Sequence, residues 1–147
     1  MAVKPIVVIG SSNIDLVAKS PKIPVVGETL TGSDFFMTPG GKGANQAVAA
    51  AKLGAEVVFV ARLGQDVFAE KSLENFKSVN INTKHIAQLE GVPSGVALIA
   101  IDDHGKNIII VIPGANGKLM PADAVKAEVF GQPDRLAADA PGALRRL

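Results

Sequence analysis

The hydrophobic pattern opens with Ile6–Ile9, a continuous apolar and β-branched run that Gly10 closes. Such a run is typical of a strand that is buried on both faces of a sheet. A helix is expected from about Gly41 to Leu53, because small apolar residues recur on one face and Gly54 follows as a cap. The next apolar run, Val57–Ala61, completes a strand, helix, strand order that indicates a parallel α/β sheet.

The rest of the pattern predicts a second helix and two pairs of strands. Asp66–Val79 carries an approximate apolar stripe, with Asp66 as its N-cap. Short antiparallel strands are expected near 14–19 and 28–37, where prolines confine them to edges or exposed ribbons. Residues 94–112 predict a hairpin with apolar side chains on both faces, so each of its faces has to cover something.

Composition narrows the class of protein. The chain has 147 residues, 48% hydrophobic and 20% charged, which is typical of one folded domain and excludes a disordered chain. A net charge of +1 gives no general attraction to nucleic acid or to an anionic membrane. With no cysteine and two histidines, neither a disulfide framework nor a metal site is expected.

No stretch suggests export or membrane insertion. The longest apolar run, Ile108–Ile112, is far shorter than the about 18 residues of a membrane span. An acid and a lysine follow the N-terminal apolar run at once, where a signal peptide would stay apolar. We therefore expect a cytoplasmic protein.

A glycine-rich turn, Gly40–Asn45, leads into the first predicted helix. Such turns bring backbone N–H groups and the positive end of the helix dipole to a ligand. The turn fits neither the phosphate-binding GxxxxGK[ST] loop nor the dinucleotide fingerprint, whose third glycine is replaced here by Gln46. Two interpretations remain open: an ordinary helix entry, or a neutral polyol site formed by Lys42, Asn45 and the backbone amides.

A second polar cluster, Gly10–Asp15, follows the first predicted strand. Ligands of open α/β folds bind beyond the carboxyl ends of strands. Asn13 and Asp15 are two apart on extended chain and so point the same way, where an amide and a carboxylate could clamp neighbouring hydroxyls. The alternative is a plain Asx turn. The two clusters in this order are more specific than either alone.

Together, seven short motifs between about Ile6 and Glu128 resemble ribokinase-like members of the PfkB-type carbohydrate kinase family. They are Ser12–Asp15, Pro24 with Gly27–Thr29, Gly40–Ala47, Ala51 with Leu53–Ala55, Gly64 with Asp66 and Phe68, Gly95–Ala97, and Pro113–Asn116.

The resemblance implies an α/β fold with a central, largely parallel sheet flanked by helices and a small β lid over the sugar. The substrate-binding residues that it implies are Asn13, Ile14, Asp15, Gly41, Lys42, Gly43, Ala44 and Asn45. Apolar lid contacts would come from Ala97, Ile99 and Val111. The implied reaction moves a phosphoryl group from ATP to the 5-hydroxyl of ribose, with Mg²⁺ and a monovalent cation, K⁺. One face of the lid would cover the sugar and the other would pack against the lid of a second copy, in a homodimer.

The chain departs from the family pattern in its second half. The catalytic base of the family lies in a Gly-Ala-Gly-Asp turn, which does not occur in the 147 residues. We therefore expect no catalytic residue and no ATP, Mg²⁺ or K⁺ site here, in an N-terminal part of a kinase domain over residues 1–128. Residues 129–147 hold three of the four arginines and predict an atypical, disordered tail such as a frameshift or truncation produces.

Three functional hypotheses follow: a sugar kinase fragment that lacks its catalytic part, a non-catalytic sugar-binding or dimerising module, and a degenerate product without a role. Half a sheet would leave strand edges and apolar surface open to water. The isolated chain is therefore expected to be marginally stable or prone to aggregation.

Overall fold

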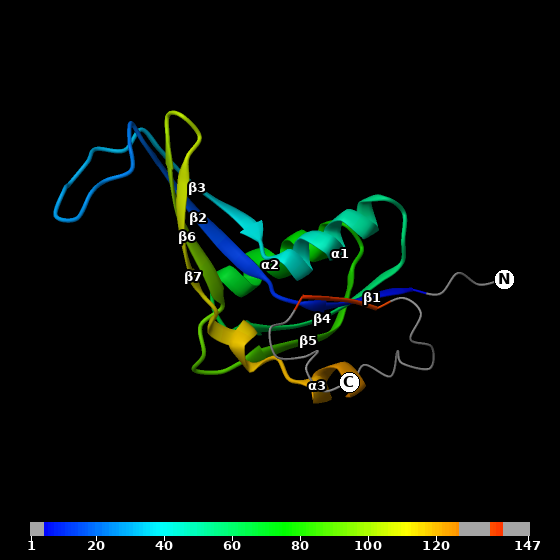
Figure 1. Cartoon of the computed structure of the whole chain (residues 1–147). Helices are drawn as coiled ribbons and strands as arrows, with labels where there is room; N and C mark the ends of the chain where they lie inside the picture. The colour runs from blue at the N-terminus through cyan, green and yellow to red at the C-terminus, as the bar shows by residue number, and fades with distance from the viewer. Residues whose placement is uncertain (1–4, 127–135, 140–147) are drawn as a thin grey trace.

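The computed structural model of this chain describes residues 5–126 and 136–139. It has two four-stranded sheets, a central one covered by helices and a second one that projects from its end as a lid (Figure 1). The central sheet has the order β5-β4-β1-β8, and each neighbouring pair is parallel. Its strands are β1 (Ile6–Gly10), β4 (Val57–Gly64), β5 (Asn82–Leu89) and β8 (Leu136–Asp139). The predicted α/β class with a largely parallel sheet is confirmed.

Two helices cover one face of the central sheet, α1 (Lys42–Lys52) and α2 (Val67–Ser78) (Figure 1). Small alanines of α1 pack against Val8 and Phe59 of the sheet, and the Phe59 ring meets Phe76 of α2 edge to face at 5.2 Å. Both helices lie within about one residue of their predicted ranges. The Asp66 side chain caps α2 by accepting from the Ala69 N–H at 2.9 Å.

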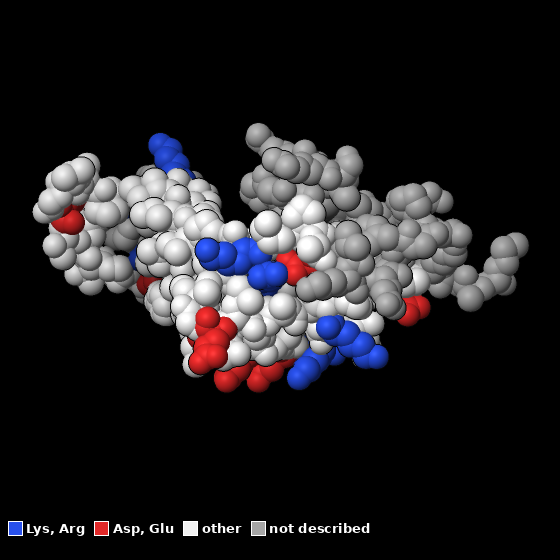
Figure 2. Space-filling view, turned by 90° about the horizontal axis from the view of Figure 1, so that it is seen from below, with Lys and Arg blue, Asp and Glu red and all other residues white. Residues whose placement is uncertain are grey.

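The other face of the sheet is covered by the chain that leaves the lid, a short 3₁₀ helix η1 (Gly114–Lys118) and α3 (Pro121–Lys126) (Figure 1). Leu119 and Ala124 pack there against alternate residues of β1 and β4. Seen from this side, basic and acidic side chains are interspersed over the described part of the surface (Figure 2). Such a surface has no extended field of one sign.

The lid sheet has the order β3-β2-β6-β7. Its strands are β2 (Asn13–Ser20), β3 (Asp34–Gly40), β6 (Gly95–Asp102) and β7 (Asn107–Ile112). The hairpin expected over 94–112 is the antiparallel pair β6 and β7. The strand expected near 28–37 begins only at Asp34, which pairs with Lys19, and that part of the prediction was wrong. Residues 21–33 instead form a loop that includes Gly27 at φ 83° and a Gly32 too close to the Lys19 carbonyl for a side chain.

Two strands of the central sheet lie outside the predicted elements. β5 was missed because its sequence, NTKHIAQL, is mostly polar and lies at a half-buried edge. β8 pairs in parallel with β1 and comes from the arginine-rich segment. The disorder predicted for 129–147 does not hold for β8, which lies within that range. Residues 129–135 and 140–147 lie outside the described residues, and disorder there stays a prediction.

No helix in the described part of the chain is both long and apolar enough to cross a membrane.

Candidate functional site

The two polar clusters of the sequence meet at the carboxyl end of β1. The Ala44 N–H, in the first turn of α1, donates to the Ser11 carbonyl at 2.9 Å. A Cβ on Gly43 would lie 2.7 Å from the Gly10 Cα, and one on Gly41 would lie 2.8 Å from the Ser11 oxygen. Gly41 also has φ 92°, a conformation that favours glycine. The glycines of the turn therefore allow the start of α1 to touch the backbone that follows β1.

This meeting point is where the strand order reverses. The chain runs from β1 to β4 and β5 on one side, and β8 lies on the other side of β1. Ligands of open α/β sheets bind in the crevice at such a switch point, outside the carboxyl ends of the strands. Topology and sequence motif thus indicate the same place.

Strand register puts the predicted lid contacts on the face that carries Asn13 and Asp15. Asp15 pairs with Ala97, which pairs with Val111, and Ile99 lies two residues beyond Ala97 on β6. Paired residues and residues two apart share a face of a sheet. All five side chains therefore project from one side of the lid, whereas Ile14 is buried on the other.

The Asp15 carboxylate packs closely against Gly40, because a Cβ on that glycine would collide with it. Burial raises the pKa of Asp15 above its ordinary value. No hydrogen bond to this carboxylate comes from the part of the chain that the structure describes. Its oxygens are therefore free acceptors beside the start of α1.

The other predicted contacts divide by exposure. Lys42 and Asn45 are exposed in the first turn of α1, so their side chains are accessible to a ligand. Gly43 and Ala44 are buried, as is the Ile14 side chain, so these residues offer no side chain to a ligand, and the Ala44 N–H is already donated to the Ser11 carbonyl. A ligand at this site would therefore meet an amide, a carboxylate, an ammonium group and backbone amides.

One residue of the site was missed by sequence reasoning, although it lies in a quoted motif. Asn116, in η1, donates from Nδ2 to Asn13 Oδ1 at 2.8 Å and to the Ser12 carbonyl at 3.1 Å. Its Oδ1 accepts from the Ser12 N–H at 2.9 Å. The signal was Pro113–Asn116, one of the motifs of the resemblance, to which no role was assigned.

A second hydrogen-bonded group holds the base of the lid to α2. Ser94, just before β6, donates its N–H and its hydroxyl to Asp66, both at 2.7 Å. Burial by itself raises the pKa of Asp66, but the hydrogen bonds from Ser94 and from backbone N–H groups lower it overall. The same carboxylate therefore caps α2 and anchors the lid.

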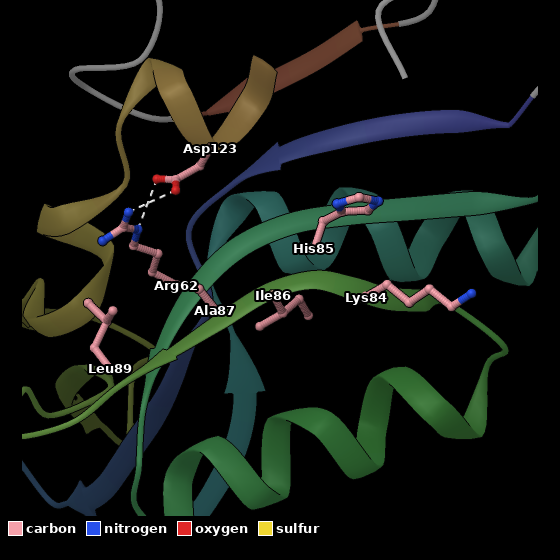
Figure 3. Close-up of a pocket in the computed structure, with 7 residues that line it drawn as sticks. All are labelled: Arg62, Lys84, His85, Ile86, Ala87, Leu89 and Asp123. Carbon is pink, nitrogen blue, oxygen red and sulfur yellow. Dashed lines mark hydrogen bonds and ion pairs between the residues drawn. The ribbon is translucent and has the colours of Figure 1, made fainter. Parts of the chain in front are cut away.

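A separate pocket of about 280 Å³ lies between the central sheet and α3 (Figure 3). Its lining residues are Arg62, Lys84, His85, Ile86, Ala87, Leu89 and Asp123. Arg62 donates to both oxygens of Asp123, at 2.8 and 2.7 Å, and the Lys84 ammonium points away from this pair. None of the predicted site residues lines this pocket, and its charged pair serves to hold α3 on β4.

The described residues hold no group of three or more His, Cys, Asp or Glu side chains that could bind a metal ion.

Comparison with known proteins identifies the family. Residues 3–140 match the family model described as "pfkB family carbohydrate kinase", and the match continues past Glu128, the approximate end of the resemblance in the sequence. The chain belongs to the pfkB family of carbohydrate kinases.

Within that family the chain is similar to ribokinases. It is 42% identical to the ribokinase of Mus musculus over 122 residues, which are 83% of this chain and 38% of that protein. The deoxyribokinase of Salmonella typhi is 43% identical over 122 residues, 83% of this chain and 40% of that protein. The chain thus spans about two fifths of the length of these relatives.

Solved structures give the same picture. The structure of ribokinase from Giardia lamblia matches with a TM-score of 0.80 and 36% identity, over 88% of this chain and 39% of that one. Arabidopsis thaliana ribokinase complexed with ribose and ATP matches with a TM-score of 0.72 and 33% identity, over 82% and 38% of the two chains.

Proposed function

We propose that this chain is the sugar-binding part of a ribokinase-like sugar kinase, with ribose as the sugar. One observation carries the proposal: Asn13 and Asp15 meet the start of α1 at the switch point of the sheet. The ribokinases and the deoxyribokinase to which the chain is similar support a pentose.

The chemistry of the site suits neighbouring hydroxyl groups. An ionised carboxylate only accepts hydrogen bonds and a side-chain amide both donates and accepts, so Asp15 and Asn13 complement hydroxyls that do both. Lys42 and the positive end of the α1 dipole would add favourable interactions with ligand oxygens. Ala97, Ile99 and Val111 would lie over the apolar C–H surface of the sugar ring, as the shared face of the lid allows.

In the proposed reaction, the kinase transfers the γ-phosphoryl group of ATP to the 5-hydroxyl of ribose. The described residues offer no carboxylate cluster for Mg²⁺, and the sequence contains no Gly-Ala-Gly-Asp turn. We therefore propose no role for these residues in holding ATP, Mg²⁺ or K⁺, and assign no step of phosphoryl transfer to them. We expect the 147-residue chain to bind ribose without forming ribose 5-phosphate from ATP.

The partners and location follow the same proposal. We propose that a second copy of the chain packs against the outer face of the lid, where Met37, Leu98 and Ile110 are 43%, 44% and 60% exposed. Register places these three residues on the face opposite to Asp15. A ribose kinase would act in the cytoplasm, where ATP is available.

Thermal unfolding in the presence of sugars tests the proposed function. A ligand that binds only the folded state raises the melting temperature with concentration. We expect ribose and 2-deoxyribose to raise it at millimolar concentration, and Asn13→Ala to abolish that rise. A melting temperature that ribose leaves unchanged would refute sugar binding by this chain.

A further inference from the structure

The orientation of the Asn116 amide is dictated by the backbone of Ser12. The Ser12 N–H can only donate, and it faces Asn116 Oδ1 at 2.9 Å. The Ser12 carbonyl can only accept, and it faces Asn116 Nδ2 at 3.1 Å. Turning the Asn116 amide over would place donor against donor and acceptor against acceptor, so only one orientation satisfies both groups.

Asn116 in turn dictates the orientation of the Asn13 amide. Its Nδ2 has two protons, of which one serves the Ser12 carbonyl. The other is donated to Asn13 Oδ1 at 2.8 Å. If Asn13 presented its Nδ2 to Asn116 instead, two N–H groups would face each other.

The Asn13 side chain is left with its donor group for a ligand. Oδ1 and Nδ2 diverge from one carbon atom, so Nδ2 lies on the side away from Asn116. Within residues 5–126 and 136–139, Nδ2 of Asn13 has no hydrogen-bond partner. Asn13 also projects from the same face of the lid as Asp15, since the two residues are two apart on β2.

The contact between Asn116 and Asn13 depends on Gly95. A Cβ at Gly95 would collide with Asn116 Nδ2 and with Asn13 Oδ1. Gly95 is buried at the start of β6, and it pairs with Asn13 in the lid sheet. The lid therefore leaves room for this pair of amides at its base.

We propose that Asn116 is a positioning residue for sugar binding, which orients Asn13 so that its N–H₂ group donates to a sugar hydroxyl. The inference deepens the proposed function and rests on it. In this arrangement the sugar hydroxyl at Asn13 accepts a hydrogen bond from Nδ2. The Asp15 carboxylate is then the side chain that accepts hydrogen bonds from sugar hydroxyls. Asn116 acts through Asn13 and is not itself a sugar contact.

The variant Asn116→Asp replaces the Nδ2 donor by an oxygen acceptor and leaves the shape of the side chain nearly unchanged. The new oxygen faces Asn13 Oδ1, so the Asn13 amide turns over and presents its carbonyl to the sugar. Ribose affinity is then expected to fall about tenfold, because a donor to the sugar is lost and the Ser12 carbonyl is left facing an acceptor. Asn107→Asp is the matched control, because Asn107 is exposed at the far end of the lid from Asn116.

Binding of sugar analogues distinguishes a positioning role of Asn116 from a merely structural one. Fluorine can accept a hydrogen bond but cannot donate one. At the hydroxyl that meets Asn13, we expect the unmodified chain to bind the deoxyfluoro ribose more tightly than the deoxy ribose, and N116D to invert that order. Calorimetric titration measures both. An order that is the same in the two proteins would overturn the inference, whereas an unmodified chain that binds no ribose would refute the proposed function instead.

A measurement on the unmodified chain decides the question if N116D does not fold. Side-chain amide protons that are hydrogen-bonded exchange slowly with water. By NMR without sugar, we expect slow exchange for the Asn116 amide protons and fast exchange for those of Asn13. Fast exchange at Asn116 with slow exchange at Asn13 would show the opposite orientation and overturn the inference.

Discussion

Ser12 and Ser94 are both buried, with 1% and 3% of their surface exposed, but they differ in hydrogen bonding. The Ser94 hydroxyl donates to Asp66. The Ser12 hydroxyl has no hydrogen-bond partner among the described residues. Replacing a hydrogen-bonded buried hydroxyl leaves its partner unsatisfied, whereas replacing an unpartnered one removes only its own burial cost.

The two alanine variants should therefore behave differently. We expect Ser94→Ala to lower the free energy of unfolding by about 1–3 kcal/mol, and Ser12→Ala to change it by less than about 0.5 kcal/mol. Urea denaturation followed by circular dichroism measures both. Equal losses for the two variants would contradict the described hydrogen bonding.

Burial of the Asp15 carboxylate carries a cost to stability, which the proposed role of Asp15 in sugar binding would explain. Its pKa is raised by burial, so the unfolded chain releases the proton first as the pH rises. Between the ordinary pKa of 3.8 and the raised value, the folded state holds more protons, and the free energy of unfolding falls with increasing pH. Above the raised pKa, the full cost of burying the ionised Asp15 carboxylate is present in the free energy of unfolding.

We therefore expect Asp15→Asn to raise the melting temperature at neutral pH and to remove this part of the acid dependence. Melting curves between pH 3 and pH 7 would show it, with Asp103→Asn, an exposed residue of the lid turn, as the control. A melting temperature that D15N lowers at pH 7 would mean that the carboxylate stabilises the free protein.

At the residue scale, sequence reasoning found the candidate ligand contacts Asn13 and Asp15. It did not find Asn116, whose side chain orients Asn13. Asn13 and Asp15 followed from a two-residue spacing on extended chain, which depends only on local geometry. The contact of Asn116 with Asn13 joins residues 103 positions apart and depends on how the lid returns to the sheet. Local periodicity holds no information on such a contact.

At the element scale, the close packing of α1 on the end of β1 forms the candidate site. The sequence predicted the two motifs, Gly10–Asp15 and Gly40–Asn45, but not their contact. That contact depends on glycines that let the two backbones approach each other closely. β5 was missed and β3 began later than expected for a related reason. An edge strand with polar residues and a loop rich in proline and glycine lack the alternating pattern that a half-buried strand shows.

Gly43 tests this packing. In Gly43→Ala the new methyl would lie 2.7 Å from the Gly10 Cα, which is backbone and cannot move aside cheaply. We expect a loss of about 1–3 kcal/mol in the free energy of unfolding, although alanine is the better helix former, together with weaker ribose binding.

Gly117→Ala is the matched control, because a Cβ there would meet only the Pro113 Cβ at an ordinary 3.7 Å. Urea denaturation and ribose titration of both variants measure the difference. A G43A variant as stable as G117A would contradict the described contact between α1 and β1.

At the scale of the whole molecule, the lid leaves apolar side chains exposed that a second copy can cover. Ile110→Asp places a charge on the outer face of the lid, where Ile110 is 60% exposed. Burying an unpaired charge in an interface is costly, so we expect the unmodified chain to sediment as a dimer and I110D as a monomer. Analytical ultracentrifugation measures this. Leu53→Asp is the control, at an apolar residue that is 89% exposed at the end of α1. Monomers of the unmodified chain at micromolar concentration would contradict the dimer.

The fold class could be predicted because it depends on the alternation of strands and helices, which sequence patterns show directly. The two-sheet arrangement was accessible through the resemblance of short motifs rather than through periodicity. The marginal stability expected from the sequence stays a prediction, and the same sedimentation experiment would reveal it as aggregation.

We propose that Asn13, Asp15 and the start of α1 form a sugar site. Isothermal titration of the 147-residue chain with ribose at pH 7.5 tests it most directly, with Asp15→Asn and Asp103→Asn measured beside it. We predict saturable binding by the unmodified chain and by D103N, and at least about a tenfold loss in D15N, since a charged acceptor to hydroxyl groups is removed. Absence of ribose binding by the folded chain, or equal affinity in D15N, would contradict the account.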